Sequence, residues 1–265
     1  MRYLGHFALM AAVSLALGSF APAFAQSGPQ QQAAATAVSH ARVVSLSLVK
    51  GTVAARKPGS REWFHATLNT PIEEGYSIAT AKNGFAEVQF ENGSTVRIGP
   101  YSRIEFTELA LGPRSGRVNH LTLTTGLATI HVIPERHDEY VVNAAGATVT
   151  PEHGKTEFRT DVSRGRVRVE VFRGHVEAAD SAQGVMLTRN HTVAFDARAA
   201  GSFQESARIQ RDAWDAWSQE RDREEDLAAY RRVDDPNRTG GLLYGWDDLV
   251  PFGGMGSFPD GSGDN

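Results

Sequence analysis

Residues 84–106, GFAEVQFENGSTVRIGPYSRIEF, alternate apolar and polar side chains on both sides of a short turn. Successive side chains of a strand point to opposite faces, so this alternation predicts two antiparallel strands with one face in a core and one in water. The residues expected in the core are Ala86, Val88, Phe90, Val96 and Ile98. The residues expected to face water are Glu87, Gln89, Glu91 and Arg97.

The turn between these strands contains Asn92-Gly93, and face parity decides its length. A two-residue loop would send Val96 to the solvent face. A three-residue loop of residues 91–93 keeps Val96 in the core and pairs it with Val88. We therefore expect the longer loop, with Gly93 in the left-handed conformation that glycine adopts at least cost.

An internal repeat extends this reading to the neighbouring strands. Two alternating apolar residues, a glycine and a further apolar residue recur around Gly51, Gly126 and Gly174. The apolar parity changes by one at each glycine, which predicts a bulge or corner where the chain bends from one sheet into a facing one. We expect residues 42–200 to form an all-β domain, a two-sheet roll or solenoid-like sandwich of short strands; a chance recurrence of the motif is the alternative.

The first 25 residues have the features of a signal peptide: Arg2, an apolar run over residues 7–20, and Ala23-Phe24-Ala25 before Gln26. The run is shorter than the 18 or more residues of a spanning helix. We expect cleavage after Ala25, a periplasmic or secreted location and no membrane span afterwards; an uncleaved anchor is the alternative. Residues 26–41, rich in Gln, Ala and Ser, predict a flexible leader.

Composition excludes several classes of function. The 265-residue chain has no cysteine, so thiol nucleophiles, thiolate metal sites and a disulfide framework are excluded. Its net charge of −4 becomes −5 without Arg2, and the acidic excess lies after residue 200. The nearly neutral β region offers no strong basic patch for a phosphate backbone, so we expect no nucleic-acid partner.

Residues 201–232 predict the single helix of the chain, because Ser202 and Glu205 form a capping-box pattern and neither Gly nor Pro follows before residue 233. Phe203, Ala207, Trp214 and Trp217 fall near one stripe and predict an anchoring face, whereas the charged residues 219–226 are expected in solvent.

Residues 233–265 form a Gly-rich aromatic tail, with eight glycines and an apolar segment at residues 242–246. The tail is expected either to dock on its own domain or to contact another molecule. Together with the helix, it could form a contact arm on a β platform, and self-docking explains the same residues.

Catalytic motifs for metalloproteases, serine hydrolases, P-loop enzymes and dinucleotide binders are absent from the sequence. His131 and His137 flank Pro134-Glu135, and a divalent ion held there with Glu135, Asp138 or Glu139 is the alternative to solvated loop histidines. The remaining histidines of the β region also lack ligand spacing: His65, His120, His153, His175 and His191. The carboxylate pairs Glu73-Glu74 and Asp138-Glu139 lie in turn-like segments. We expect no catalytic, cofactor-binding or metal-binding residue.

The pattern AEVQFENGSTVRIGPYSRIEF, with GTVAA upstream and VEVFRGHVEAA downstream, resembles the FecR domain over residues 43–196. The resemblance implies an extracytoplasmic all-β module, found in cell-surface signalling regulators and in secreted proteins. In the regulators such a domain receives a contact from an outer-membrane receptor, and a cytoplasmic helical domain restrains a sigma factor. Only six residues precede the apolar run, so we expect no cytoplasmic anti-sigma domain here. The helix and tail instead resemble those of a secreted FecR-domain group.

We therefore expect a non-enzymatic interaction or scaffold module that contacts another protein of the cell envelope. The alternative is glycan or peptidoglycan binding through aromatic loops, with Trp63, Phe64 and Tyr101 as stacking residues. The other role for these aromatic side chains is to close the open end of the sandwich. A metal-dependent enzyme is a third, weaker reading.

Overall fold

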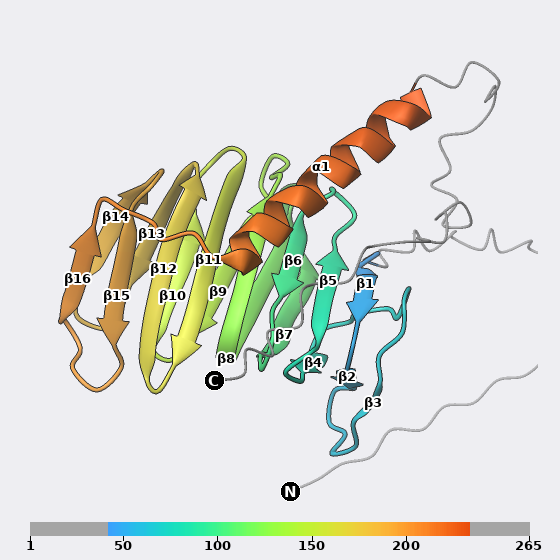
Figure 1. Ribbon diagram of the computed structural model, residues 1–265, viewed down its shortest axis with the longest axis horizontal. Coiled ribbons are helices and arrows are strands. Elements are labelled where there is room, and N and C mark those ends of the chain that lie inside the picture. Colours follow the sequence, from blue (N-terminus) through green and yellow to red (C-terminus); the bar gives the residue numbers. More distant parts are fainter. Residues whose placement is uncertain (1–41, 234–265) are drawn as a thin grey trace, which may run out of the picture. The chain divides into compact units, whose positions relative to one another are not determined.

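Two facing layers of strands, A and B, make up most of the computed structural model, which describes residues 42–233 (Figure 1). Layer A contains, in spatial order, β1 (Ser45–Lys50), β5 (Phe85–Gln89), β6 (Thr95–Ile98), β8 (Arg117–Val132), β11 (Thr156–Ser163), β12 (Arg166–Arg173), β15 (Thr192–Asp196) and β16 (Phe203–Ser206). Layer B contains β3 (Phe64–His65), β2 (Val53–Arg56), β4 (Ser77–Thr80), β7 (Arg103–Leu111), the first half of β8, β9 (Glu139–Ala144), β10 (Ala147–Pro151), β13 (His175–Ala179) and β14 (Gly184–Thr188). The predicted all-β two-sheet class is confirmed.

Strand β8 belongs to both layers, and its corner lies at Gly126. Residues before the corner pair with β7 and, in parallel, with β9, whereas residues after it pair with β6 and β11. Gly126 has a φ of 83°, and a Cβ there would lie 2.2 Å from Oγ of Ser102. Only glycine fits both the backbone conformation and the close approach.

The other two predicted corners are also confirmed. The chain passes from β1 in layer A to β2 in layer B at Gly51, and from β12 to β13 at Gly174. Both glycines have positive φ values, 67° and 78°. The repeat therefore marks the places where the chain changes layer.

The hairpin between β5 and β6 has the predicted register. Val88 lies opposite Val96, and Ala86 lies opposite Ile98. The loop is closed by a hydrogen bond from the Phe90 amide to the Ser94 carbonyl, at 2.9 Å. Gly93 has a φ of 81°, as the three-residue loop requires.

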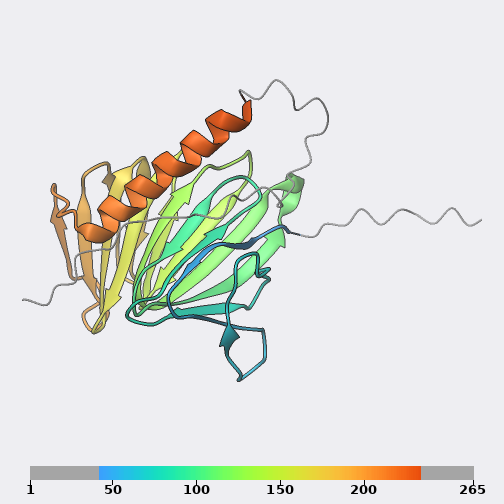
Figure 2. The same cartoon turned by 45° about the vertical axis from the view of Figure 1, so that its right-hand side comes forward.

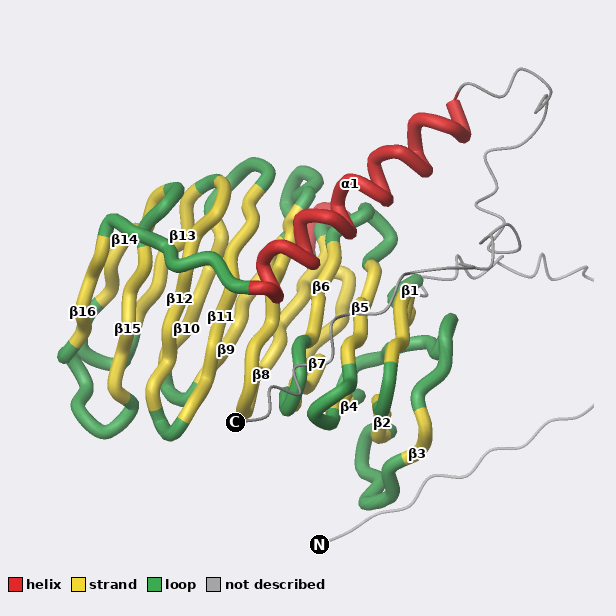
Figure 3. Tube along the Cα trace, in the orientation of Figure 1, coloured by secondary structure: helices red, strands yellow, loops and turns green. Residues whose placement is uncertain are grey.

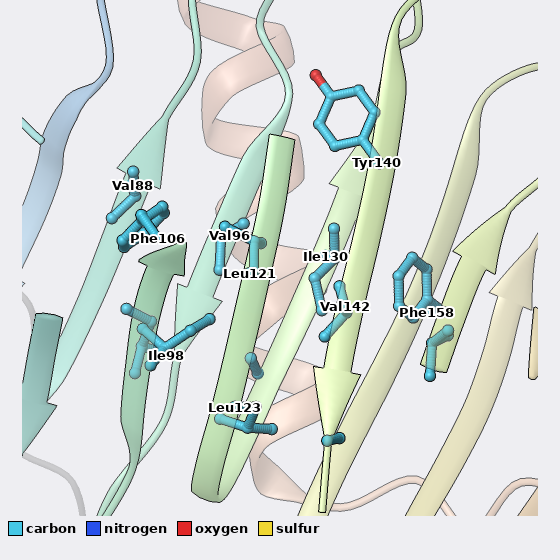
Figure 4. Close-up of a cluster of buried hydrophobic side chains, with 14 of the residues drawn as sticks. Val88, Val96, Ile98, Phe106, Leu121, Leu123, Ile130, Tyr140, Val142 and Phe158 are labelled. Carbon is cyan, nitrogen blue, oxygen red and sulfur yellow. The ribbon is translucent and has the colours of Figure 1, made fainter. Parts of the chain in front are cut away.

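The two layers face each other (Figure 2), and the hydrophobic core fills the space between them (Figure 4). Ile98 and Ile130 come from layer A, and Phe106 and Leu121 come from layer B; all four are essentially inaccessible to solvent. Because neither layer closes on itself, the core ends at the last strands on each side, and the fold is not a closed barrel.

The C-terminal helix α1 spans Ala213–Val233, so the predicted start of the helix at residue 201 is wrong. Residues 203–206 form β16 instead, and Phe203 packs against Phe195 of β15 with ring centroids 6.0 Å apart. The S-x-x-E pattern is a local signal, and pairing with the exposed edge of β15 overrides it. The β domain accordingly extends past residue 200.

The predicted signal peptide, the predicted leader and the residues of the tail after Val233 lie outside the described residues. Between residues 42 and 233, no helix is both long and apolar enough to span a bilayer.

The corner assignment predicts that Gly174→Val destabilises the domain more than Gly59→Val. Both glycines have positive φ, but a Cβ at Gly174 would lie 2.6 Å from Oγ1 of Thr156, whereas nothing lies within 4 Å of one at Gly59. The additional clash is worth on the order of 1–3 kcal/mol. Thermal melting of the two variants measures the difference, and equal shifts would contradict the assignment.

Candidate functional site

A row of polar residues crosses the outer face of layer A, with one residue from each of seven adjacent strands. Each member is the direct register partner of the next, so their side chains share one face. We call this set the polar row: Glu87, Arg97, Thr129, Arg159, Glu170, Thr192 and Ser206.

Helix α1 lies across the strands on this face (Figure 3). Its residues form hydrogen bonds with the first four members of the polar row. Arg97 is 1% exposed, and its Nε donates to Glu87 at 2.7 Å. Its Nη1 donates to the carbonyl of Ser218 at 2.8 Å and lies 2.7 Å from the carboxylate of Asp222. Glu225 lies 3.3 Å from Nη2. The guanidinium thus joins the sheet to the helix.

Arg159 repeats this arrangement at the beginning of the helix. Its Nη1 lies 2.9 Å from Asp212 and 3.2 Å from Asp215. The same two aspartates form the cap of α1: the amide of Asp215 donates to Asp212, and the amide of Asp212 donates to Asp215. The true capping box is therefore D-x-x-D at residue 212, and it is aligned by a cation from the sheet.

An aromatic cluster provides the apolar part of this contact. Trp214 stacks on Phe85 with ring centroids 5.8 Å apart, and Trp217 lies 4.8 Å from Trp214. The indole N–H of Trp214 donates to Oγ1 of Thr129 in the polar row, at 2.9 Å. The predicted anchoring role of the two tryptophans is confirmed, whereas Phe203 and Ala207 precede the helix.

Two expectations about solvent exposure are wrong. Glu87 and Arg97 were expected in water and are instead buried beneath α1. The charged part of the helix was also expected in solvent, yet Arg221 donates to Glu87 at 3.0 Å, and Asp222 and Glu225 bind Arg97. The charges on the outer face of layer A and on the facing side of α1 compensate each other, so both surfaces can be buried without apolar side chains.

In this contact the pKa of Glu87 is lowered, whereas the pKa of Glu225 is raised. Burial opposes ionisation of Glu87, but Arg97 and Arg221 outweigh it and lower the pKa of Glu87 to about 2. Burial, followed by the charge of Glu87, raises the pKa of Glu225 to about 8. Burial likewise lowers the pKa of His131, which lies 3.9 Å from Asp222, and raises the pKa of Glu157.

Three of the residues considered as metal ligands have other partners: Glu135, Asp138 and His131. Glu135 and Asp138 bind Arg117, at 2.7 and 3.4 Å. His131 faces Asp222 under α1, and His137 is exposed in the turn. Within residues 42–233, no group of three or more His, Asp or Glu side chains is arranged to hold a metal ion.

The aromatic residues considered for sugar stacking have different environments. Arg56 and Arg103 both lie over the ring of Trp63, 5.1 and 5.4 Å from its centroid. Phe64 and Tyr101 are 36% and 63% exposed. The exposed Tyr101 does not close the end of the sandwich.

Sequence reasoning missed the helix contact, although the chain carries a signal for it. Asp215, Ser218, Asp222 and Glu225 are spaced by three or four residues, so they lie on one face of a helix. A polar stripe of this kind indicates a polar docking surface as readily as a solvated one. The choice between them needs Arg97 and Arg159, which come from distant strands.

Arg97→Met is expected to destabilise the protein by about 3–5 kcal/mol, because it leaves the buried Glu87 with less compensating charge. Arg166→Met is the matched control, since Arg166 is 78% exposed and lies 3.9 Å from Asp196. Removing such a surface pair costs about 0–1 kcal/mol. Urea unfolding of both variants checks this, and similar losses would show that the Arg97 contact is dispensable.

Glu225 makes the helix contact sensitive to pH. Its pKa rises from its ordinary value of 4.5 to about 8 in the folded protein, so its contribution is complete at low pH and is lost as pH rises between these values. The lowered pKa of Glu87 has the opposite effect on stability, because its contribution is lost as pH falls from 4.5 to about 2. Neutral His131 also favours docking, so its protonation opposes the contact on the acid side.

Glu225→Gln is therefore expected to reduce the stability loss that the native chain shows between about pH 4.5 and pH 8. Thermal melting across this range, followed by tryptophan fluorescence, measures both chains. Parallel pH profiles would contradict the assignment of this titration to Glu225.

Comparison with known proteins gives a family match and a distant structural likeness. Two crystal structures of a candidate anti-sigma factor from Parabacteroides distasonis ATCC 8503, at 2.50 and 1.65 Å resolution, are similar to this chain with 16% identity and a TM-score of 0.41. The likeness covers 50% of this chain and 59% of that protein, so less than two thirds of its length is spanned. No curated protein matches the sequence.

The family model described as FecR protein matches residues 76–177. These residues run from just before β4 to β13, and they include the β5–β6 hairpin, the β8 corner and the Gly174 corner. The match lies within the region over which the sequence resembles that family. Residues 76–177 of this chain are thus a FecR domain.

Proposed function

We propose that this protein is a secreted or periplasmic, non-enzymatic FecR-like module that binds another protein of the cell envelope. The FecR domain supports a regulatory or scaffold role in the envelope. The observation that carries the proposal is the position of the unpaired strand edges. Within the described part of the chain, β14 pairs only with β13, and β16 pairs only with β15.

At the opposite end of the sandwich, the edge of layer A is covered by its own chain. Residues 66–72 run beside β1 and β2, where the amides of Leu46 and Asn69 donate to the carbonyls of Thr70 and Leu46. The edge of β1 is therefore already occupied. Strand β3, at the edge of layer B on this side, pairs only with β2 among the described residues and is two residues long, so the longer free edges lie at the β14–β16 end.

Strand β14 has the properties of an accepting edge. Its outer backbone groups have no strand partner among the described residues, and Met186 is 44% exposed. Val185 is only partly buried against the core. An extended segment of a partner would add backbone hydrogen bonds and cover these side chains.

Helix α1 acts in this proposal as a brace rather than as a contact arm. Trp214 is 7% exposed and packs on Phe85 of the same chain. The acidic face of the helix binds Arg97 and Arg159. Self-docking, the simpler of the two explanations for these residues, is supported. The role proposed for the tail concerns residues outside the described part.

Glycan or peptidoglycan binding through aromatic loops is the second candidate. The exposure of Phe64 and Tyr101 supports it, whereas the two arginines over Trp63 occupy the ring that a sugar would need. A polysaccharide and peptidoglycan pull-down, run beside the protein pull-down, distinguishes the two.

Met186→Lys is expected to reduce capture of the envelope partner by about tenfold, because a lysine on an edge strand opposes strand addition. Leu111→Lys is the control, since Leu111 is 42% exposed at the end of β7. Cross-linking of the full mature chain in envelope extracts, read by mass spectrometry, measures both. Equal capture by the two variants, with unchanged melting temperatures, would overturn the β14 edge as the binding site.

A further inference from the structure

The polar row continues beyond the helix, and its last three members differ from the first four. Glu170, Thr192 and Ser206 line a groove of about 620 Å³ between β12, β15 and the segment 206–211. This segment runs from the end of β16 back across the sheet towards the start of α1 (Figures 1 and 3). One hydrogen bond, from Oγ1 of Thr192 to the carbonyl of Arg208, connects this segment to β15, which forms part of the floor of the groove.

Glu170 is the group in this groove that is incompletely satisfied. Its side chain is 4% exposed, and Arg168 lies 3.8 Å from its Oε1. Its Oε2 is buried and has no hydrogen-bond partner among the described residues. Burial also raises the pKa of Glu170. An unsatisfied buried carboxyl oxygen costs stability, and a ligand hydroxyl that reaches it through a shift of the exposed segment 206–211 would recover that loss.

The rest of the lining combines cations with neutral hydrogen-bonding groups. Arg208 is exposed and makes no ion pair with any described residue, while Arg168 binds Asp161 at 3.3 Å. Asn190 and Gln210 contribute amides beside the hydroxyl groups of the floor. A carboxylate would pair with the arginines, and a polyhydroxylated ring would exchange hydrogen bonds with the amides, the hydroxyls and Glu170.

We propose that this groove binds a uronic acid, either as a free sugar or as a unit of an acidic polysaccharide. The volume suits one or two sugar rings. An acidic peptide would satisfy the arginines, but it carries fewer hydroxyl donors for Glu170 and the amides. The site is separate from the β14 edge and from the aromatic residues Trp63 and Tyr101.

The test is isothermal titration of the full mature chain with galacturonate and digalacturonate, with galactose and a diglutamate peptide as comparisons. We expect binding of the uronates and at least about tenfold weaker binding of galactose, because the contact with the arginines is lost. Tighter binding of digalacturonate than of galacturonate assigns a polysaccharide unit, and equal binding assigns the free sugar.

Variants locate the site. Arg208→Gln and Glu170→Gln are each expected to weaken uronate binding by about tenfold, whereas Arg166→Gln, on the same strand as Glu170 but outside the lining, leaves it unchanged. Arg208 is exposed, so its variant keeps the test valid even if Glu170→Gln alters folding.

No uronate binding, binding that is insensitive to Arg208, or diglutamate binding as tight as that of digalacturonate would each overturn the proposal.

Discussion

The guanidinium of Arg97 lies at the centre of the contact between the sheet and the helix. It is almost fully buried, and it binds a carboxylate of the neighbouring strand together with the backbone and acids of α1. A buried cation without such partners would cost several kcal/mol. The sheet therefore requires the helix to cover this face, and the helix, whose described residues offer little apolar surface beyond two tryptophans, requires the sheet.

The second constraint is the repeated change of layer. Three glycine corners move the chain between the layers, from A to B at Gly51 and Gly174 and from B to A at Gly126, where the long strand β8 turns without interruption. Each corner places consecutive strands in facing layers, so every turn of the chain adds to one continuous core. A stack built in this way has two ends. Residues 66–72 cover the edge of β1 at one of them, whereas at the other the outer edges of β14 and β16 have no strand partner among residues 42–233.

These two constraints determine which surfaces remain for partners. The outer face of layer A is occupied by α1 over Glu87, Arg97, Thr129 and Arg159, so it is unavailable as long as the helix is docked. On that face the groove beside Glu170 remains uncovered. At the end of the stack, the outer edges of β14 and β16 are also uncovered by the described residues.

The features that the sequence alone determined depend on near neighbours in the chain. Alternation predicts the β5–β6 hairpin and its register, and the parity change at Gly51, Gly126 and Gly174 predicts the corners, because both follow from the side-chain period of a strand. The features that only the tertiary structure decided depend on distant partners. Arg97 is polar and of outward parity, and nothing local shows that Ser218, 121 residues later, will cover it. Likewise, Ser202–Glu205 carries a helix-start pattern, but the open edge of β15 makes residues 203–206 a strand, and Arg159 aligns the true cap at Asp212. Local patterns define which face a side chain takes, whereas the packing of remote segments defines whether that face meets water.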